Sequence, residues 1–179
     1  SATPGKVQLA HKSDVPGGDF SGVWSGKEYD AVSTPVAGTN YYSNKATVDV
    51  LTYDEDYLYR VGNDGKWSDV YTIETSGSTS FSFLLAGDPQ IGAGSMSTDP
   101  TGWANTLDFI NKNLSDASFL ISAGDQVNTY NNHTQYSGYT NDALASLTTA
   151  VSIGNHDSSN GRDDNPFQSY FTMPNMDST

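Results

Sequence analysis

The sequence predicts a small antiparallel β-sandwich followed by an α/β segment that is built on a parallel sheet. Up to about Thr75, short runs of β-branched and aromatic residues alternate with clusters of turn residues, which is typical of antiparallel strands. After the polar stretch 76–80, compact apolar runs alternate with a helical periodicity, which favours strand–helix–strand units and a parallel sheet. We therefore predict two domains, over residues 1–76 and 77–179.

The first half combines strand patterns with a strong hairpin signal. In the run Tyr57 to Val61, alternate residues share one face of a strand, while Arg60 faces the other way. The connection Gly-Asn-Asp-Gly at 62–65 tolerates positive φ and therefore predicts a hairpin turn. We expect strands at 6–12, 28–33, 46–53, 57–61 and 70–74.

The second half alternates apolar strands with helices. Asp99 followed by Pro100 offers an N-cap and then a proline at the first helical position. An apolar stripe at helical spacing follows, and a further stretch at about 135–147 is partly helical. We expect strands at 81–86, 119–121 and 150–153, and the stripe consists of Trp103, Leu107, Ile110 and Leu114.

Each of these three strands ends in a glycine that is followed by a residue able to ligate a metal ion. In an open α/β sheet, ligands bind just beyond the carboxyl ends of the strands, so we expect the three loops to project into one crevice. They bring two carboxylates, two side-chain amides and one imidazole. The three motifs are Gly87-Asp88-Pro89-Gln90, Gly124-Asp125-Gln126-Val127-Asn128 and Gly154-Asn155-His156-Asp157.

This inventory suits metal-dependent chemistry at phosphorus. Oxygen ligands favour hard or borderline divalent ions. A carboxylate such as Asp125 can bridge two cations about 3.5–4 Å apart, which is the arrangement for in-line displacement at a phosphate ester. His156 follows a ligand directly and has Asp157 beside it, which suits a general acid or a donor to a phosphoryl oxygen.

The motifs Gly-Asp-x-Gln, Gly-Asp-x-Val-Asn and Gly-Asn-His-Asp, in this order after apolar strands, resemble the first three signatures of the calcineurin-like metallophosphoesterases, a family that includes the purple acid phosphatases. The resemblance implies two divalent metal ions of the Fe, Mn or Zn type. Position by position, it implies that Asp88 and Gln90 hold the first metal, that Asp125 bridges and that Asn155 holds the second. His156 would be the catalytic histidine, with Asp157 beside it.

The N-terminal half carries a second resemblance. Tyr-Leu-Tyr-Arg-Val-Gly at 57–62 and Lys-Trp-Ser-Asp-Val-Tyr at 66–71 resemble the end of the fibronectin type III-like domain that precedes the catalytic domain of purple acid phosphatases. The implied architecture is a fibronectin type III-like β-sandwich followed by the first part of an α/β metallophosphatase core, with β-sheet layers flanked by helices.

Members of the family carry two further histidine motifs downstream, and the sequence stops at Thr179 before them. We expect these segments to be supplied by the remainder of the same protein, either as a second chain left by cleavage or as a continuation. We expect this chain alone to be inactive.

Two positions depart from the family pattern. The family usually has His where Gln90 stands, and an amide oxygen is a harder ligand than imidazole, which leaves the metal identity open. Purple acid phosphatases place Tyr three residues after the bridging Asp, where this chain has Asn128. Tyr130 stands two residues further on, so we do not expect the tyrosinate–iron colour.

Composition excludes other classes. The 21 acidic against 8 basic residues, a formal net charge of −13, argue against binding to a nucleic-acid backbone. The absence of cysteine excludes disulfides, thiolate zinc sites and cysteine nucleophiles. No apolar run reaches membrane-spanning length. Richness in Ser, Thr, Asn, Gly and Tyr is common among bacterial extracellular proteins, which predicts an extracellular or cell-surface location.

Several alternatives stay open at this point. The main rival is a non-enzymatic extracellular β-sandwich that binds or adheres, with an incomplete and inactive α/β segment. His133 either reaches substrate or is a solvated loop residue, and His11 is expected to be structural. The tyrosines at 41, 42, 57 and 59 either form a carbohydrate-binding face or are ordinary strand residues. The substrate is open between a phosphate monoester, a diester, a nucleotide and a phosphoprotein.

Overall fold

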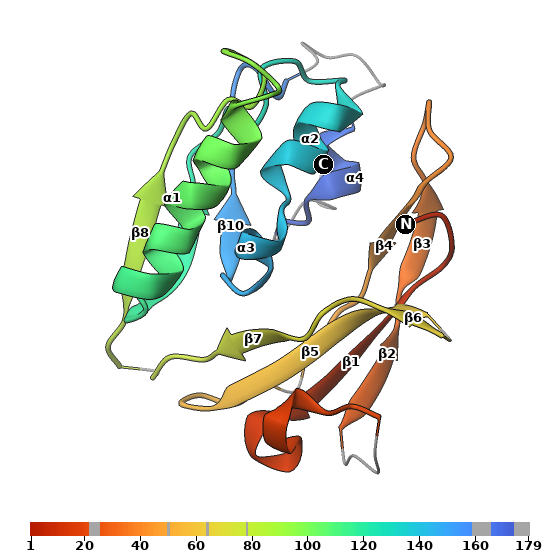
Figure 1. Ribbon diagram of the computed structural model, residues 1–179, viewed down its shortest axis with the longest axis vertical. Coiled ribbons are helices and arrows are strands. Elements are labelled where there is room, and N and C mark those ends of the chain that lie inside the picture. The colour runs from red at the N-terminus through yellow and green to blue at the C-terminus, as the bar shows by residue number, and fades with distance from the viewer. Residues whose placement is uncertain (22–25, 50, 64, 78, 159–165, 174–179) are drawn as a thin grey trace. The chain divides into compact units, whose positions relative to one another are not determined.

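The structure is a computed structural model that describes residues 1–21, 26–49, 51–63, 65–77, 79–158 and 166–173 (Figure 1). The chain divides into two compact units, Ser1–Phe81 and Ser82–Thr179. The boundary that the sequence predicts, between residues 76 and 77, lies in the connection between the last strand of the first unit and the first strand of the second.

The first unit is antiparallel throughout its described strands. Its larger sheet has the order β2-β1-β5-β6, with β7 also pairing with β5. The smaller sheet pairs β3 with β4. Two short 3₁₀ turns, η1 and η2, follow β1. The bounds are β1 Lys6–His11, η1 Lys12–Asp14, η2 Pro16–Gly18, β2 Lys27–Asp30, β3 Val32–Pro35, β4 Tyr42–Lys45, β5 Asp56–Asn63, β6 Lys66–Trp67 and β7 Tyr71–Glu74.

The hairpin predicted at 62–65 joins β5 to β6, with Gly62 opposite Trp67 and Asn63 opposite Lys66. Gly65 has a φ of 100°, a conformation that glycine adopts without strain. Residue 64 of the predicted turn lies outside the described residues.

The run 28–33, predicted as one strand, is divided between two sheets. The break falls at Ala31, whose N–H donates to Gly5 O at 3.0 Å. On one side β2 pairs with β1, and on the other β3 pairs with β4. The alternating pattern is the same on both sides of Ala31, so the sequence gives no sign that the chain changes sheets there.

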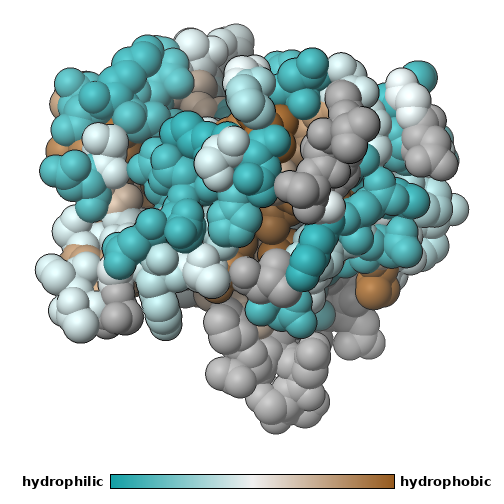
Figure 2. Space-filling view, turned by 90° about the horizontal axis from the view of Figure 1, so that it is seen from below, coloured by the Kyte–Doolittle hydropathy of each residue, from teal (hydrophilic) through white to brown (hydrophobic). Residues whose placement is uncertain are grey.

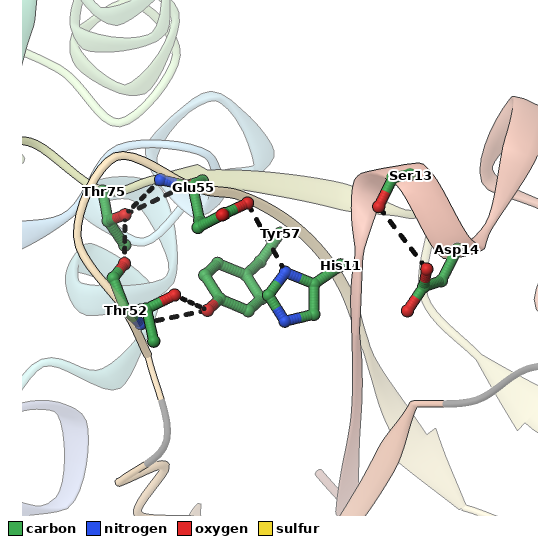
Figure 3. Close-up of polar contacts among 7 residues, drawn as sticks. All are labelled: His11, Ser13, Asp14, Thr52, Glu55, Tyr57 and Thr75. Atoms are coloured by element: carbon green, nitrogen blue, oxygen red, sulfur yellow. Dashed lines mark hydrogen bonds and ion pairs between the residues drawn. The ribbon is translucent and has the colours of Figure 1, made fainter.

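The strand predicted at 46–53 is wrong, because the described residues of that run form no strand and β4 ends at Lys45. Side chains form hydrogen bonds with backbone groups that would otherwise pair with a neighbouring strand. The Thr52 N–H donates to Tyr57 Oη at 3.0 Å, and Thr52 O accepts from Thr75 Oγ1 at 2.6 Å (Figure 3). His11 packs on the same tyrosine, with ring centroids 4.6 Å apart, and its Nδ1 lies 3.7 Å from Glu55 Oε2.

Arg60 organises the face of β5 opposite Tyr57. Its guanidinium lies over the rings of Phe20 and Trp67, at 5.0 and 4.7 Å from their centroids. Its Nε donates to Gln8 Oε1 at 2.9 Å, and Gln8 in turn donates to Glu28 Oε2 at 3.0 Å. Planar stacking and hydrogen bonding together hold the positive charge beside an apolar cluster. That cluster consists of Ala10, Val15, Phe20 and Leu58.

We expect Arg60→Ala to lower the free energy of unfolding of the first unit by about 1–3 kcal/mol, since it removes two cation–π contacts and leaves Gln8 without its donor. Arg60→Lys should recover little, because an ammonium cannot stack flat on both rings. Denaturant unfolding followed by tryptophan fluorescence measures both. Lys12→Ala, which removes an exposed ion pair to Asp56, is the control and should have a smaller effect. An unchanged midpoint for Arg60→Ala would contradict this account.

The second unit contains a parallel sheet in the order β10-β9-β8. Helix α1 connects β8 to β9, and α2 and α3 lie between β9 and β10. The bounds are β8 Ser82–Ala86, α1 Asp99–Asn113, β9 Ala117–Ser122, α2 His133–Tyr139, α3 Asp142–Ala145, β10 Thr149–Val151 and α4 Phe167–Tyr170.

The two faces of this sheet differ. One face packs Leu84, Leu120 and Val151 into a core cluster with three members of the predicted stripe, Trp103, Leu107 and Ile110. The fourth, Leu114, caps the end of α1 and is 42% exposed. Successive strand residues point to opposite faces. The other face therefore carries Phe83 and Leu85, which are 50% and 69% exposed, and Phe83 stacks on Phe119 with centroids 5.4 Å apart.

The start of α1 differs by one residue from the prediction. Thr98 is the N-cap, and Asp99 is the first helical residue. The Asp99 carboxylate instead reaches back into the preceding loop, where Oδ2 accepts N–H groups from Gly92, Gly94 and Ser95 at 2.9–3.1 Å. Desolvation opposes ionisation of Asp99, but these bonds outweigh it and lower its pKa. Asp99 therefore fixes the loop that follows β8.

The surface agrees with the polar composition. Hydrophilic residues predominate on the face drawn in Figure 2, with hydrophobic side chains visible between them. Within the described ranges, no helix has the length and apolar character needed to cross a membrane.

Candidate metal centre at the strand ends

The loops that follow β8 and β9 lie side by side beyond the sheet. Their backbones continue the parallel pairing, with Asp88 N–H donating to Gly124 O at 3.3 Å and Gln90 N–H donating to Asp125 O at 2.8 Å. A parallel bridge between Ile91 and Val127 extends the contact further. Two of the predicted ligand-bearing loops are thus joined through their main chains.

The loop after β10 joins this pair through two carboxylates. Asp125 Oδ1 accepts the N–H of His156 at 2.9 Å. In the opposite direction, Asp157 accepts the N–H groups of Gln126 and Val127 at 3.3 and 3.2 Å. Each loop therefore supplies a carboxylate to the backbone of the other.

Three predicted ligands have left-handed backbones. Asp88, Gln90 and Asp125 have φ values of 53°, 43° and 53°, and Asp54 in the first unit is the other non-glycine residue with positive φ among those described. Such a conformation is costly for residues with a Cβ and persists where surrounding contacts enforce it. Strain gathered at one place is a frequent mark of a functional site.

The predicted side chains differ in exposure. Asp88 and Asn155 are exposed, Gln90 and His156 are half-buried, and Asp125 is buried. The Gln90 amide donates from Nε2 to Asn128 Oδ1 at 3.3 Å. Hydrogen bonds join the loops that carry Asp88, Gln90, Asp125 and His156, and Asn155 lies between Gly154 and His156 in the same turn.

His156 is oriented by a residue that the sequence did not single out for this role. Its Nδ1 lies 2.9 Å from the backbone oxygen of Asn128. Because a carbonyl oxygen only accepts, this contact assigns the proton to Nδ1 and leaves Nε2 as the available nitrogen of the neutral ring. A backbone contact of this kind leaves no mark in the residue types, so sequence reasoning had no signal for it.

Asp157 is wholly buried and belongs to the interior of the unit. Burial raises the pKa of its carboxyl, and backbone N–H groups of Gly154, Val127 and Gln126 oppose that shift. Two buried tyrosines of α2, Tyr136 and Tyr139, are close enough to sense its charge. Burial, with a contribution from Asp157, raises the pKa of Tyr139 to about 12.

His133 is half-buried at the start of α2, and its Nδ1 lies 2.9 Å from Tyr170 Oη in α4. The sequence left open whether His133 is a solvated loop residue or contacts substrate, and the structure adds a packing role for it. The ring of Tyr170 also stacks on Tyr136 with centroids 4.4 Å apart.

The donor set fits part of a metal site. Asp88, Gln90, Asp125 and Asn155 offer oxygen atoms, which suit hard or borderline cations. Asp125 uses Oδ1 for the His156 N–H, which leaves Oδ2 available. Across the described parts of the chain, however, no group of three or more His, Cys, Asp or Glu side chains is placed to hold a metal ion.

Comparisons with known proteins find two similarities. Residues 1–75 match the family model for the N-terminal domain of purple acid phosphatase. The solved structure of purple acid phosphatase PPD1 from yellow lupin (Lupinus luteus) seeds has a similar fold, with a TM-score of 0.64 and 16% sequence identity. No match is found among curated proteins.

The likeness covers 96% of this chain and 36% of the lupin chain, so this chain spans roughly a third of that length. The resemblance to purple acid phosphatases is therefore confirmed, for the N-terminal domain by the family model and for nearly the whole chain by its fold.

At Gly154 the turn after β10 lies close against the loop after β9. A Cβ there would collide with the Asp125 backbone nitrogen and Oδ1. We expect Gly154→Ala to destabilise the second unit by about 1–3 kcal/mol, because the loops must separate to make room. Gly102→Ala in α1 is the matched control, since nothing lies within 4 Å of its Cβ. That change should stabilise the helix by about 0.5–1 kcal/mol. Thermal unfolding measures both, and equal shifts would refute the close approach.

Proposed function

We propose that this chain is the front part of a metal-dependent phosphoesterase that hydrolyses phosphate esters with a water nucleophile. The observation that supports the proposal is the exchange of backbone and carboxylate hydrogen bonds among the three strand-end loops that carry the predicted ligands. The family match of residues 1–75 supports the class independently of those residues.

In this proposal Asp88 and Gln90 would hold the first metal ion, Asp125 would be shared between the two ions and Asn155 would hold the second. The ions, of the Fe, Mn or Zn type, would supply Lewis-acid polarisation of the phosphate and lower the pKa of a bound water. The chain's own contribution is to fix the donors. Left-handed backbones at three of the four positions, enforced by main-chain contacts, support that role.

His156 acts as general acid or as a donor to a phosphoryl oxygen. With Nδ1 on Asn128 O, its Nε2 is the nitrogen that exchanges a proton with substrate. The contact supports this role because it restricts rotation of the ring.

The remaining ligands come from further residues of the same protein, as a continuation or as a second chain. One observation supports this part of the proposal. The face of the parallel sheet opposite the core cluster exposes Phe83 and Leu85. On this view the first unit is a fibronectin type III-like domain, and the second unit is the first part of an α/β metallophosphatase core. We further propose that the protein acts outside the cell.

The test uses the longest natural form of the protein, an aryl phosphate as substrate and metal analysis of each variant. Asp125→Asn should abolish hydrolysis and reduce metal content, because the bridging charge is lost. His156→Ala should keep most of the metal and lose roughly 10²–10⁴ in rate, the usual contribution of a positioned acid–base group. Asp108→Asn, on the exposed side of α1, is the control and should match the wild type.

Wild-type activity in both site variants would exclude the assignment. If the wild-type protein binds none of the three metals and leaves the aryl phosphate intact, the non-enzymatic binding or adhesion module becomes the better account.

A further inference from the structure

We propose that Asp157 is a positioning residue, which holds the loop carrying Asp125 in its left-handed conformation through backbone N–H groups, and that it is not a proton-transfer partner of His156. The assignment of Asp125 as a metal ligand rests on the proposed function. The geometric part of the inference does not.

The contacts of Asp157 define a clamp between two loops. Its Oδ2 accepts the N–H groups of Gly154 at 2.9 Å and Gln126 at 3.3 Å, and its Oδ1 accepts that of Val127 at 3.2 Å. The residue is wholly buried. A buried carboxylate is tolerated where several donors satisfy it, and the same bonds satisfy amides that would otherwise be buried without partners.

The clamp acts on the backbone that immediately follows Asp125. Asp125 has a φ of 53°, and Gly124 before it has a φ of 104°. Immediately after Asp125, the amides of Gln126 and Val127 are held by Asp157. Asp125 completes the exchange by accepting the His156 N–H at 2.9 Å. The strained backbone of Asp125 is thus fixed from both directions by the turn that follows β10.

His156 has a separate orienting contact, between its Nδ1 and Asn128 O. The two acceptors therefore orient different groups. Asn128 orients the imidazole, and Asp157 orients the loop that presents Asp125.

Asp157→Asn replaces one acceptor by an N–H₂ group of the same shape. The variant keeps most bonds when its oxygen takes the Oδ2 position, which serves Gly154 and Gln126. The amide nitrogen then faces the Val127 N–H, and that bond is lost. Val127 should therefore be the amide most affected.

Amide hydrogen exchange by NMR on the full chain tests this point. In Asp157→Asn, the amide of Val127 should exchange at least about tenfold faster than in the wild type, with a smaller increase for Gln126 and Gly154 and little change elsewhere in the second unit, as expected for local opening. Leu107→Ala, a cavity in the buried face of α1, is the control and should accelerate exchange throughout that unit. The same pattern in both variants would overturn the proposal.

A measurement on the wild-type protein tests the clamp even if the Asp157→Asn variant does not fold. A scalar coupling across the hydrogen bond should connect the Asp157 carboxylate carbon to the Gly154 amide nitrogen, the shortest of the three contacts. Its absence, with Gly154 exchanging as fast as an exposed amide, would overturn the clamp directly.

A pH–rate profile with an aryl phosphate separates positioning from proton transfer. Asp157→Asn should lower kcat and Mn²⁺ affinity by about 10–100-fold, as for other outer-shell partners of metal ligands, and leave the shape of the profile unchanged. A lost or displaced limb would instead assign Asp157 to proton transfer. If wild-type protein hydrolyses nothing, the proposed function fails, while exchange and coupling still decide the clamp.

Discussion

The second unit depends on a reciprocal exchange of backbone hydrogen bonds between two loops. Asp125, after β9, accepts an N–H from the turn after β10, and Asp157, in that turn, accepts N–H groups from the loop after β9. Each loop carries backbone donors whose hydrogen bonds the carboxylate of the other accepts. The close approach of Gly154 to Asp125 follows from the same exchange, since a side chain there would force the loops apart.

Much of this arrangement follows from residue order. Apolar runs that end in glycine and then a polar residue predict strand ends at one edge of a sheet, and the strands β8, β9 and β10 run parallel as the crossovers require. The helical stripe through Trp103, Leu107 and Ile110 is read from spacing alone. These features are local or follow from a general topological rule, so a single sequence contains them.

Features that depend on contacts between residues far apart in the sequence cannot be predicted from the pattern of residue types. The run 46–53 looks like a strand, but Tyr57 and Thr75 take the backbone groups of Thr52. The break at Ala31 depends on Gly5, which is far away in sequence. In the candidate site, the aspartate beside His156 suggests a partner for the imidazole, whereas its carboxylate holds backbone amides and the imidazole rests on Asn128 O. Residue type reveals a carboxylate but not which donors it meets.

We propose that three strand-end loops bring Asp88, Gln90, Asp125, Asn155 and His156 around one metal-binding crevice. Crystals grown with Mn²⁺, measured for its anomalous scattering, test it most directly. We predict an anomalous peak within about 2.0–2.6 Å of carboxylate or amide oxygens from at least two of these loops, at ordinary metal–oxygen distances. Side-chain oxygens of Asp88, Asp125 and Asn155 scattered more than about 10 Å apart, beyond the span of any shared two-metal site, would contradict it.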